Sequence, residues 1–196
     1  MRVKRAPHLV DFIELGLATG MRRDEMLRLD WNRVNLERRM IYFGEDDQKK
    51  GVPGSIPLND SAIAVLTRRR AYCRKKTPQS PWVFVNQFGD RLASVKTGFR
   101  EAAKGMRAVT PHTLRHTFAS WLVQAGVPLR VVCELCRHED IRTTMRYAHL
   151  APHSAAAFIG AIDGVLSECA QNVPEVGGTE VGFPSQPVTE GLRAAA

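Results

Sequence analysis

The chain has 196 residues, of which 44% are hydrophobic, enough for one ordinary domain with its own core. No run approaches the ~18 apolar residues of a membrane-spanning helix, and no apolar signal segment follows the start MRVKRAPH. We therefore expect a cytoplasmic protein with no membrane association. The net charge is +8, and because residues 169–196 contain three Glu and one Arg, residues 1–168 carry +10. A body this basic is typical of nucleic-acid-binding proteins.

The first predicted elements are two helices joined at a glycine. Residues 9–19 have helical periodicity, Gly20 ends that helix, and a second short helix is expected over residues 24–29. Arg22 therefore stands at a helix junction, which Gly20 can shape through a positive φ. Glu25 is placed to orient the Arg22 guanidinium, although an Arg–Glu pair at this spacing is usually a solvent-exposed contact.

The period changes to two between residues 34 and 58, where we predict strands at 40–43 and 55–58. The turn signals of DDQKKGVPG place Lys49 and Lys50 on the hairpin between them. Asn59 caps a helix over residues 60–75 that is rich in Arg and Lys on one face, and residues 82–85 form a short apolar segment. A further helix follows Ser94 and runs to about residue 104. The expected fold is mainly α (α+β), with a small antiparallel three-stranded sheet near residues 34–58.

The stretch from residue 110 to 150 carries most of the candidate chemistry. Thr110 and Pro111 have the types preferred at a helix N-cap and first turn, and Gly126 ends the helix after residue 125. Its predicted core side consists of Leu114, Phe118, Trp121 and Ala125. His112, Arg115 and His116 are predicted on roughly the opposite face, close to the helix N-terminus. Two imidazoles and a guanidinium at that position favour a phosphate site.

Two more helices are predicted at residues 128–137 and 140–147, followed by a helix of small residues at 153–168. They supply His138 and Tyr147, and Tyr147 alone among three tyrosines stands in a cluster of potential acid–base groups. Cys133 and Cys136 form a CxxC before His138, which suggests zinc, but no second CxxC completes four ligands. Small buried core positions explain both cysteines better, so we predict no metal.

These motifs taken together resemble the tyrosine recombinase (phage integrase) family. TGMRRDEM, IPLN, PHTLRHTFASWL and TTMRYAHL carry the likeness, which spans about residues 8–152. The resemblance implies a tyrosine recombinase catalytic domain at residues 8–168, with residues 1–7 as a linker-like start. Residues 169–196 are rich in Pro, Gly, Thr and Glu without periodicity, so we expect a disordered tail. The N-terminal core-binding domain that such enzymes carry is expected to be absent.

The resemblance also implies a reaction centred on Tyr147. Tyr147 is the expected nucleophile, making a 3′-phosphotyrosyl bond, while Arg22 and Arg115 clamp the non-bridging oxygens of the scissile phosphate. Two guanidiniums are expected to favour the phenolate of tyrosine and to stabilise the phosphorane. Because the covalent intermediate conserves the phosphodiester's energy, we expect no cofactor, neither ATP nor metal.

The remaining roles implied by the resemblance belong to one lysine and two histidines. Lys49, eight residues before Pro57, is expected to protonate the departing 5′ oxygen, and Lys50 remains an alternative. His112 is expected to assist proton transfer and His138 to hydrogen-bond the phosphate. The family usually has Leu-Gly-His where this chain has Cys136-Arg137-His138, so Arg137 either adds a phosphate contact or displaces His138.

The expected function is that of a site-specific DNA recombinase or integrase acting on double-stranded DNA, in a bacterial or phage-derived, nucleoid-associated setting. We expect a monomer in solution and a tetramer on paired sites, with residues 154–167 as the helix exchanged between protomers. Two alternatives stay open: a type IB topoisomerase-like enzyme, and a catalytically impaired DNA-binding regulator.

Overall fold

The computed structural model of the chain describes residues 7–44, 54–106 and 109–152, together with residues 159, 162, 163 and 167. The predicted linker-like start, the hairpin that carries Lys49, most of the predicted exchanged helix and the C-terminal tail lie outside the described residues. Residues 1–152 form one unit. Its elements in order are α1 (Pro7–Thr19), α2 (Arg23–Leu27), η2 (Trp31–Arg33), β1 (Val34–Asn35), β2 (Met40–Phe43), β3 (Gly54–Pro57), α3 (Asp60–Lys76), α4 (Lys96–Ala102), α5 (Pro111–Gln124), α6 (Leu129–Leu135), α7 (Ile141–Met145) and η4 (Ala148–Leu150).

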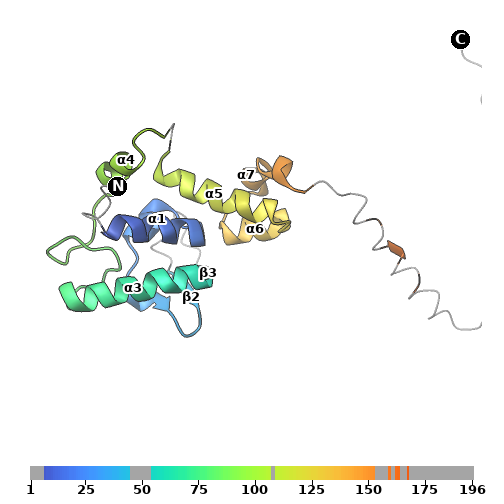
Figure 1. Cartoon of the computed structure of the whole chain (residues 1–196). Helices are drawn as coiled ribbons and strands as arrows, with labels where there is room; N and C mark the ends of the chain where they lie inside the picture. Colours follow the sequence, from blue (N-terminus) through green and yellow to red (C-terminus); the bar gives the residue numbers. More distant parts are fainter. Residues whose placement is uncertain are drawn as a thin grey trace, which may run out of the picture. The chain divides into compact units, whose positions relative to one another are not determined.

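Helix α1 lies between α3 and α5 and packs against both (Figure 1). The main core forms around it from fully buried side chains, among them Phe12, Leu15, Leu66 and Phe84. The ring of Phe84, from the apolar segment predicted at residues 82–85, meets Phe12 edge to face at 5.4 Å between centroids. Because such pairs bury large apolar area, this contact fixes the 82–85 segment against α1.

The three short strands form an antiparallel sheet in the order β1-β2-β3, which confirms the predicted fold class. Ile41 of β2 pairs with Ile56 of β3, and both side chains are buried. Tyr42, the next residue along β2, is exposed, because successive side chains of a strand point to opposite faces. The sheet therefore covers the core with one face only.

The basic face predicted for α3 has one inward exception. Arg69 is fully buried, and its guanidinium donates to the Val83 carbonyl at 3.0 Å and pairs with Asp11 at 3.6 Å. A buried guanidinium is tolerated only with such partners. Through its bond to the Val83 carbonyl, Arg69 joins the 82–85 segment to α3 inside the core and is not part of the basic surface of that helix.

Helix α5 begins and ends where predicted, but its buried face is not the predicted one. The prediction that Trp121 and Ala125 face the core is wrong: Trp121 is 54% exposed and Ala125 is exposed too. Arg115, predicted on the opposite face, is buried instead. The physical reason is that α5 contacts α1 on one side and α6 on another, and the second contact uses the small residue Ala119.

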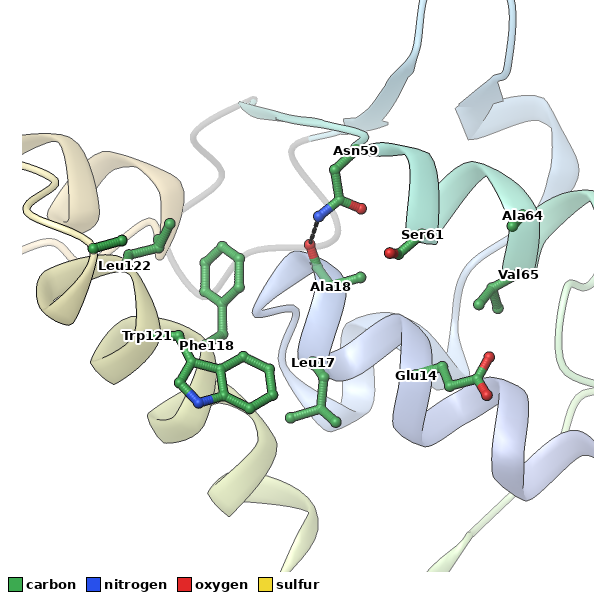
Figure 2. Close-up of a pocket in the computed structure, with 11 residues that line it drawn as sticks. Glu14, Leu17, Ala18, Asn59, Ser61, Ala64, Val65, Phe118, Trp121 and Leu122 are labelled. Atoms are coloured by element: carbon green, nitrogen blue, oxygen red, sulfur yellow. Dashed lines mark hydrogen bonds between the residues drawn. The ribbon is translucent and has the colours of Figure 1, made fainter.

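A groove of about 650 Å³ runs along the surface shared by α1, α3 and α5. Figure 2 shows Leu17 of α1 facing Phe118 and Trp121 of α5 across it. Asn59, the cap of α3, donates to the carbonyl of Ala18 at 3.2 Å and so fixes one end of the groove. Within the described residues, no helix combines the length and apolarity needed to cross a membrane.

Candidate active site

Four long-range hydrogen bonds bring four distant segments together beside the start of α5. Arg22, which precedes α2, donates from Nη2 to the carbonyl of Arg137 at 3.1 Å. Arg115 of α5 donates to the carbonyls of Gly20, at 2.8 Å, and Cys136. His116, the next residue of α5, is hydrogen-bonded through Nδ1 to the hydroxyl of Tyr147. Backbone and side-chain contacts thus assemble the site before any substrate binds.

Gly20 shapes the turn that presents Arg22. Its φ is +63°, a conformation that L side chains rarely adopt, and its amide hydrogen-bonds to the Gly16 carbonyl at 3.0 Å to end α1. A Cβ placed here would lie only 2.3 Å from the Phe118 ring. The residue is therefore required both for the turn and for the close approach of α5.

Glu25 anchors Arg22 from the interior. Its carboxylate accepts from the Arg22 amide at 2.7 Å and from the Arg22 guanidinium at 2.9 Å. The interpretation of this pair as a solvent-exposed contact is wrong, because the Glu25 side chain is only 6% exposed. Burial opposes its ionisation, but the charge of Arg137 and the hydrogen bonds from Arg22 outweigh burial and lower the pKa of Glu25. Both Nη atoms of Arg22 thus have partners, in Glu25 and the Arg137 carbonyl, while 43% of the side chain stays exposed to solvent.

Arg115 is the most deeply placed cation of the site. Its guanidinium is buried among backbone carbonyls, where burial and the charge of Arg22 lower its pKa to about 10. It therefore remains protonated at neutral pH. Two carbonyl partners fix the plane of the guanidinium, which is the pre-organisation that planar, bidentate binding of a phosphate needs.

The histidines form a neutral cluster around Tyr147. The rings of His112 and His116 meet edge to face at 4.4 Å, one helical turn apart on α5. Burial, reinforced by the charge of Arg115, lowers the pKa of both imidazoles. Burial and the charges of Arg115 and Arg22 lower the pKa of His138 to about 4. All three imidazoles are thus uncharged at neutral pH in the DNA-free protein.

Tyr147 is buried, with 7% of its surface exposed. Burial raises the pKa of Tyr147 in the DNA-free protein, although the charge of Arg115 favours the phenolate as expected. Burial dominates, and the charges of Arg146 and Arg115 offset it only in part. In the DNA-free protein Tyr147 is therefore a neutral phenol at pH 7.

Arg137 occupies the position where a glycine was expected, and its φ of +49° explains why glycine suits that position. Its guanidinium turns inward, pairs with Glu25 and lies 4.0 Å from the centre of the Phe43 ring. The hypothesis that it adds a phosphate contact finds no support in this inward position. The His138 ring is held by a hydrogen bond between its Nδ1 and the buried hydroxyl of Thr144, at 2.8 Å.

The structure gathers five of the six predicted site residues in this neighbourhood, and the sixth, Lys49, lies outside the described residues. His116 belongs to the predicted phosphate site, but the sequence indicates no separate catalytic role for it and does not single out Thr144. The signal for His116 was its spacing of four from His112, which places both rings on one helix face. Cys133 and Cys136 are buried, as predicted for small core positions.

Comparisons with known proteins agree with this geometry. A profile of the Phage integrase family matches residues 4–154. The integrase of Salmonella phage P22 is 32% identical over 180 residues, which cover 84% of this chain and 45% of that protein. Tyrosine recombinase XerD of Oceanobacillus iheyensis is 35% identical over 150 residues, covering 70% and 48%.

A solved structure shares the fold. The catalytic domain of bacteriophage HP1 integrase superposes with a TM-score of 0.59 at 25% identity, covering 80% of this chain and 83% of that one. The chain spans about half the length of the curated relatives it matches. The resemblance carried by the sequence motifs is confirmed, and the chain belongs to the phage integrase family.

Proposed function

We propose that this chain is the catalytic part of a site-specific DNA recombinase. Tyr147 cuts one DNA strand by forming a covalent bond to its phosphate, and the reverse reaction later rejoins a strand. The observation that carries the proposal is the placement of the Tyr147 hydroxyl. This hydroxyl is hydrogen-bonded to His116 of α5, the residue that follows Arg115. The guanidinium of Arg115 is close enough to Arg22 for the charge of Arg22 to lower its pKa. Two fixed cations beside a tyrosine oxygen suit in-line attack on a phosphodiester.

Each step of the proposed reaction is carried out by particular residues. The guanidiniums of Arg22 and Arg115 hold the non-bridging oxygens and stabilise the charge that grows on them. The Tyr147 oxygen bonds to phosphorus, the bond to the 5′ oxygen breaks, and Lys49 supplies the proton that this oxygen needs. His138 hydrogen-bonds the phosphate while Thr144 fixes its ring. Rejoining is the reverse, with a 5′ hydroxyl as the nucleophile.

The proposal is tested with nicked duplexes randomised around the nick, on which cleavage traps the protein covalently. The chain should give an adduct that survives SDS, and Tyr147→Phe should give none. Tyr42→Phe is the matched control, because the Tyr42 side chain is exposed on the outer face of β2. DNA binding without an adduct would favour the regulator, and relaxation of plasmids that lack any specific site would favour the topoisomerase.

Double-stranded DNA is the proposed partner, and helix α4 offers a surface for it. Lys96, Arg100 and Lys104 recur every four residues, so they share one face of α4 and the turn that follows, and all three are exposed. They line a hollow that also contains Thr110 and Pro111 at the start of α5. A basic stripe leading to the phosphate site fits a DNA backbone that continues past the cut. XerH, which shares the fold at a TM-score of 0.61 and 25% identity, was solved bound to its difH substrate.

For the assembled form we propose a tetramer on paired DNA sites, built by exchange of residues 154–167 between protomers that are monomers in solution. The groove between α1, α3 and α5 supports this, because its exposed Trp121 gives an exchanged helix an apolar surface to cover. Trp121→Glu should bind one DNA site normally and fail to form the paired-site complex in a gel. Phe88→Glu, on an exposed loop elsewhere, should form it. Since the relatives are bacterial and phage proteins, we place the reaction on DNA in the bacterial cytoplasm.

A further inference from the structure

His116 makes a contact that none of the roles above requires. Its Nδ1 is bound to the hydroxyl oxygen of Tyr147, and the two ring centres are 6.0 Å apart with the planes tilted by 53°. His116 follows Arg115 directly on α5, and Arg115 is anchored to two carbonyls. The imidazole is therefore fixed in position relative to both the nucleophile and the phosphate-binding guanidinium.

The surroundings of His116 define the direction of this hydrogen bond. On its own helix it faces His112 and Arg115, and from the segment after α7 it faces Arg146 and Tyr147. Burial and these basic neighbours lower the pKa of His116, while burial raises that of Tyr147, so both groups are neutral at pH 7. A phenol is a stronger acid than a neutral imidazole. The Tyr147 hydroxyl therefore donates, and Nδ1 of His116 accepts.

We propose that His116 is the catalytic base that removes the proton of Tyr147. As the tyrosine oxygen bonds to phosphorus, its proton moves to Nδ1, and the 5′ oxygen leaves with a proton from Lys49. On rejoining, the 5′ hydroxyl attacks phosphorus and gives its proton back to Lys49, while the bond to the Tyr147 oxygen breaks and the imidazolium returns its proton to that oxygen. The bound phosphate brings negative charge into a cluster of cations, which favours the imidazolium at the moment it forms. This proposal rests on the recombinase function proposed above.

The structure gives this role to His116 rather than His112. His112 is exposed at the helix start, where its ring contacts that of His116, and the ring of His116 in turn contacts Tyr147. A group must lie within hydrogen-bond reach of the proton it removes, and among the described residues the imidazole that is hydrogen-bonded to this hydroxyl is that of His116. His112 is left free to meet the phosphate or to stabilise the charged His116.

Two variants separate proton transfer from mere packing. His116→Asn keeps a hydrogen-bonding group close to Nδ1 but cannot take up a proton, so single-turnover cleavage should slow by about 10²- to 10⁴-fold with DNA affinity unchanged. His116→Ala should be equally slow and regain rate when imidazole is added, increasingly so with bases of higher pKa. His8→Asn, on α1, is the matched control and should cleave like the unmodified chain.

Each outcome decides the matter. The slow Asn variant together with imidazole rescue of the Ala variant supports the proposal. Cleavage by His116→Asn at the rate of the unmodified chain would overturn the base role, and the recombinase function would stand if Tyr147→Phe still gives no adduct. Slow variants that imidazole does not rescue, while their thermal unfolding stays normal, would reduce His116 to a packing role. No adduct from the unmodified chain on any nicked duplex would overturn both proposals.

Discussion

Replacement of Arg137 by glycine and by alanine tests how this chain holds its unusual residue. Both changes remove the guanidinium, and with it the pair to Glu25 and the contact with Phe43. They differ only in the backbone, because the φ of +49° costs an L side chain about 1–2 kcal/mol that glycine avoids. Glycine loses about 0.5–1 kcal/mol of this advantage through its greater freedom in the unfolded chain. The glycine variant should therefore be the more stable by about 1 kcal/mol.

Relative to the unmodified chain, Arg137→Gly both loses contacts and removes buried polar groups that lack partners. The lost contact with Phe43 is worth about 1–2 kcal/mol, and Glu25 keeps Arg22 as its partner. Against this loss, Nε and Nη1 of Arg137 are buried and find no hydrogen-bond partner in the described part of the chain. Each such group costs about 1–3 kcal/mol, a cost that the variant removes. The loss of the guanidinium is common to the Gly and Ala variants, so the backbone term decides their order.

The assay is thermal unfolding at neutral pH. The Gly variant should melt about 2–4 °C above the Ala variant. Arg28, exposed at the end of α2 with a φ of −99°, is the control, and there Ala should equal or exceed Gly. An Ala variant at 137 that is as stable as the Gly variant would refute the argument from φ. A fall of about one in the salt dependence of DNA binding by Arg137→Gly would instead show a phosphate contact.

Three further predictions concern charge. Glu25→Gln should lower the melting temperature most at neutral pH. The pKa of Glu25 is lowered in the folded chain, so its stabilisation is present above its unfolded pKa and is lost as the pH falls through its folded pKa. Melting temperatures of the variant and the unmodified chain, measured from pH 7 to 3, should therefore converge in acid. Serine at Lys96, Arg100 and Lys104 together should weaken DNA binding and reduce the slope of log affinity against log salt by about 2–3, measured by fluorescence anisotropy. His138, with a folded pKa of about 4, should stay neutral in an NMR titration until well below pH 6, and its pKa should rise when vanadate, a phosphorane mimic, is bound. Because the pKa of His138 is depressed in the folded chain, the stability that the neutral imidazole contributes is lost as the pH falls from the unfolded pKa near 6.5 towards 4.

Local sequence signals predicted the helix ends and the turn that position the site residues. Thr110 and Pro111 mark the start of α5, and Gly20 marks the turn before Arg22, because caps and positive φ values depend on neighbouring residues alone. The face of α5 was not predictable in the same way. Apolar residues at helical spacing indicate which side can be buried, but the packing of α5 on both α1 and α6 decides which side is buried, and it left Trp121 exposed.

The electrostatic character of the site depends on contacts across the sequence that no local pattern contains. Glu25 and Arg137 are 112 positions apart, and their pairing follows from the fold. The raised pKa of Tyr147 likewise follows from burial, which the polar sequence around it does not indicate. Residue types therefore predicted the members of the site, while their protonation states required the structure.

Those protonation states fit the charge of the proposed transition state better than that of the substrate. Arg22, Arg115 and Arg137 bring three positive charges, Glu25 removes one, and the imidazoles stay neutral, which leaves an excess of two. A phosphodiester carries one negative charge and the phosphorane formed from it carries two. Lys49 and Arg146 add further positive charge, so the site interacts more strongly with the phosphorane than with the substrate. Rate is gained only from interactions that are stronger in the transition state than in the bound substrate. Imidazolium rings in the resting site would shift that balance toward tight binding of uncut DNA, so lowered histidine pKa values serve the reaction directly.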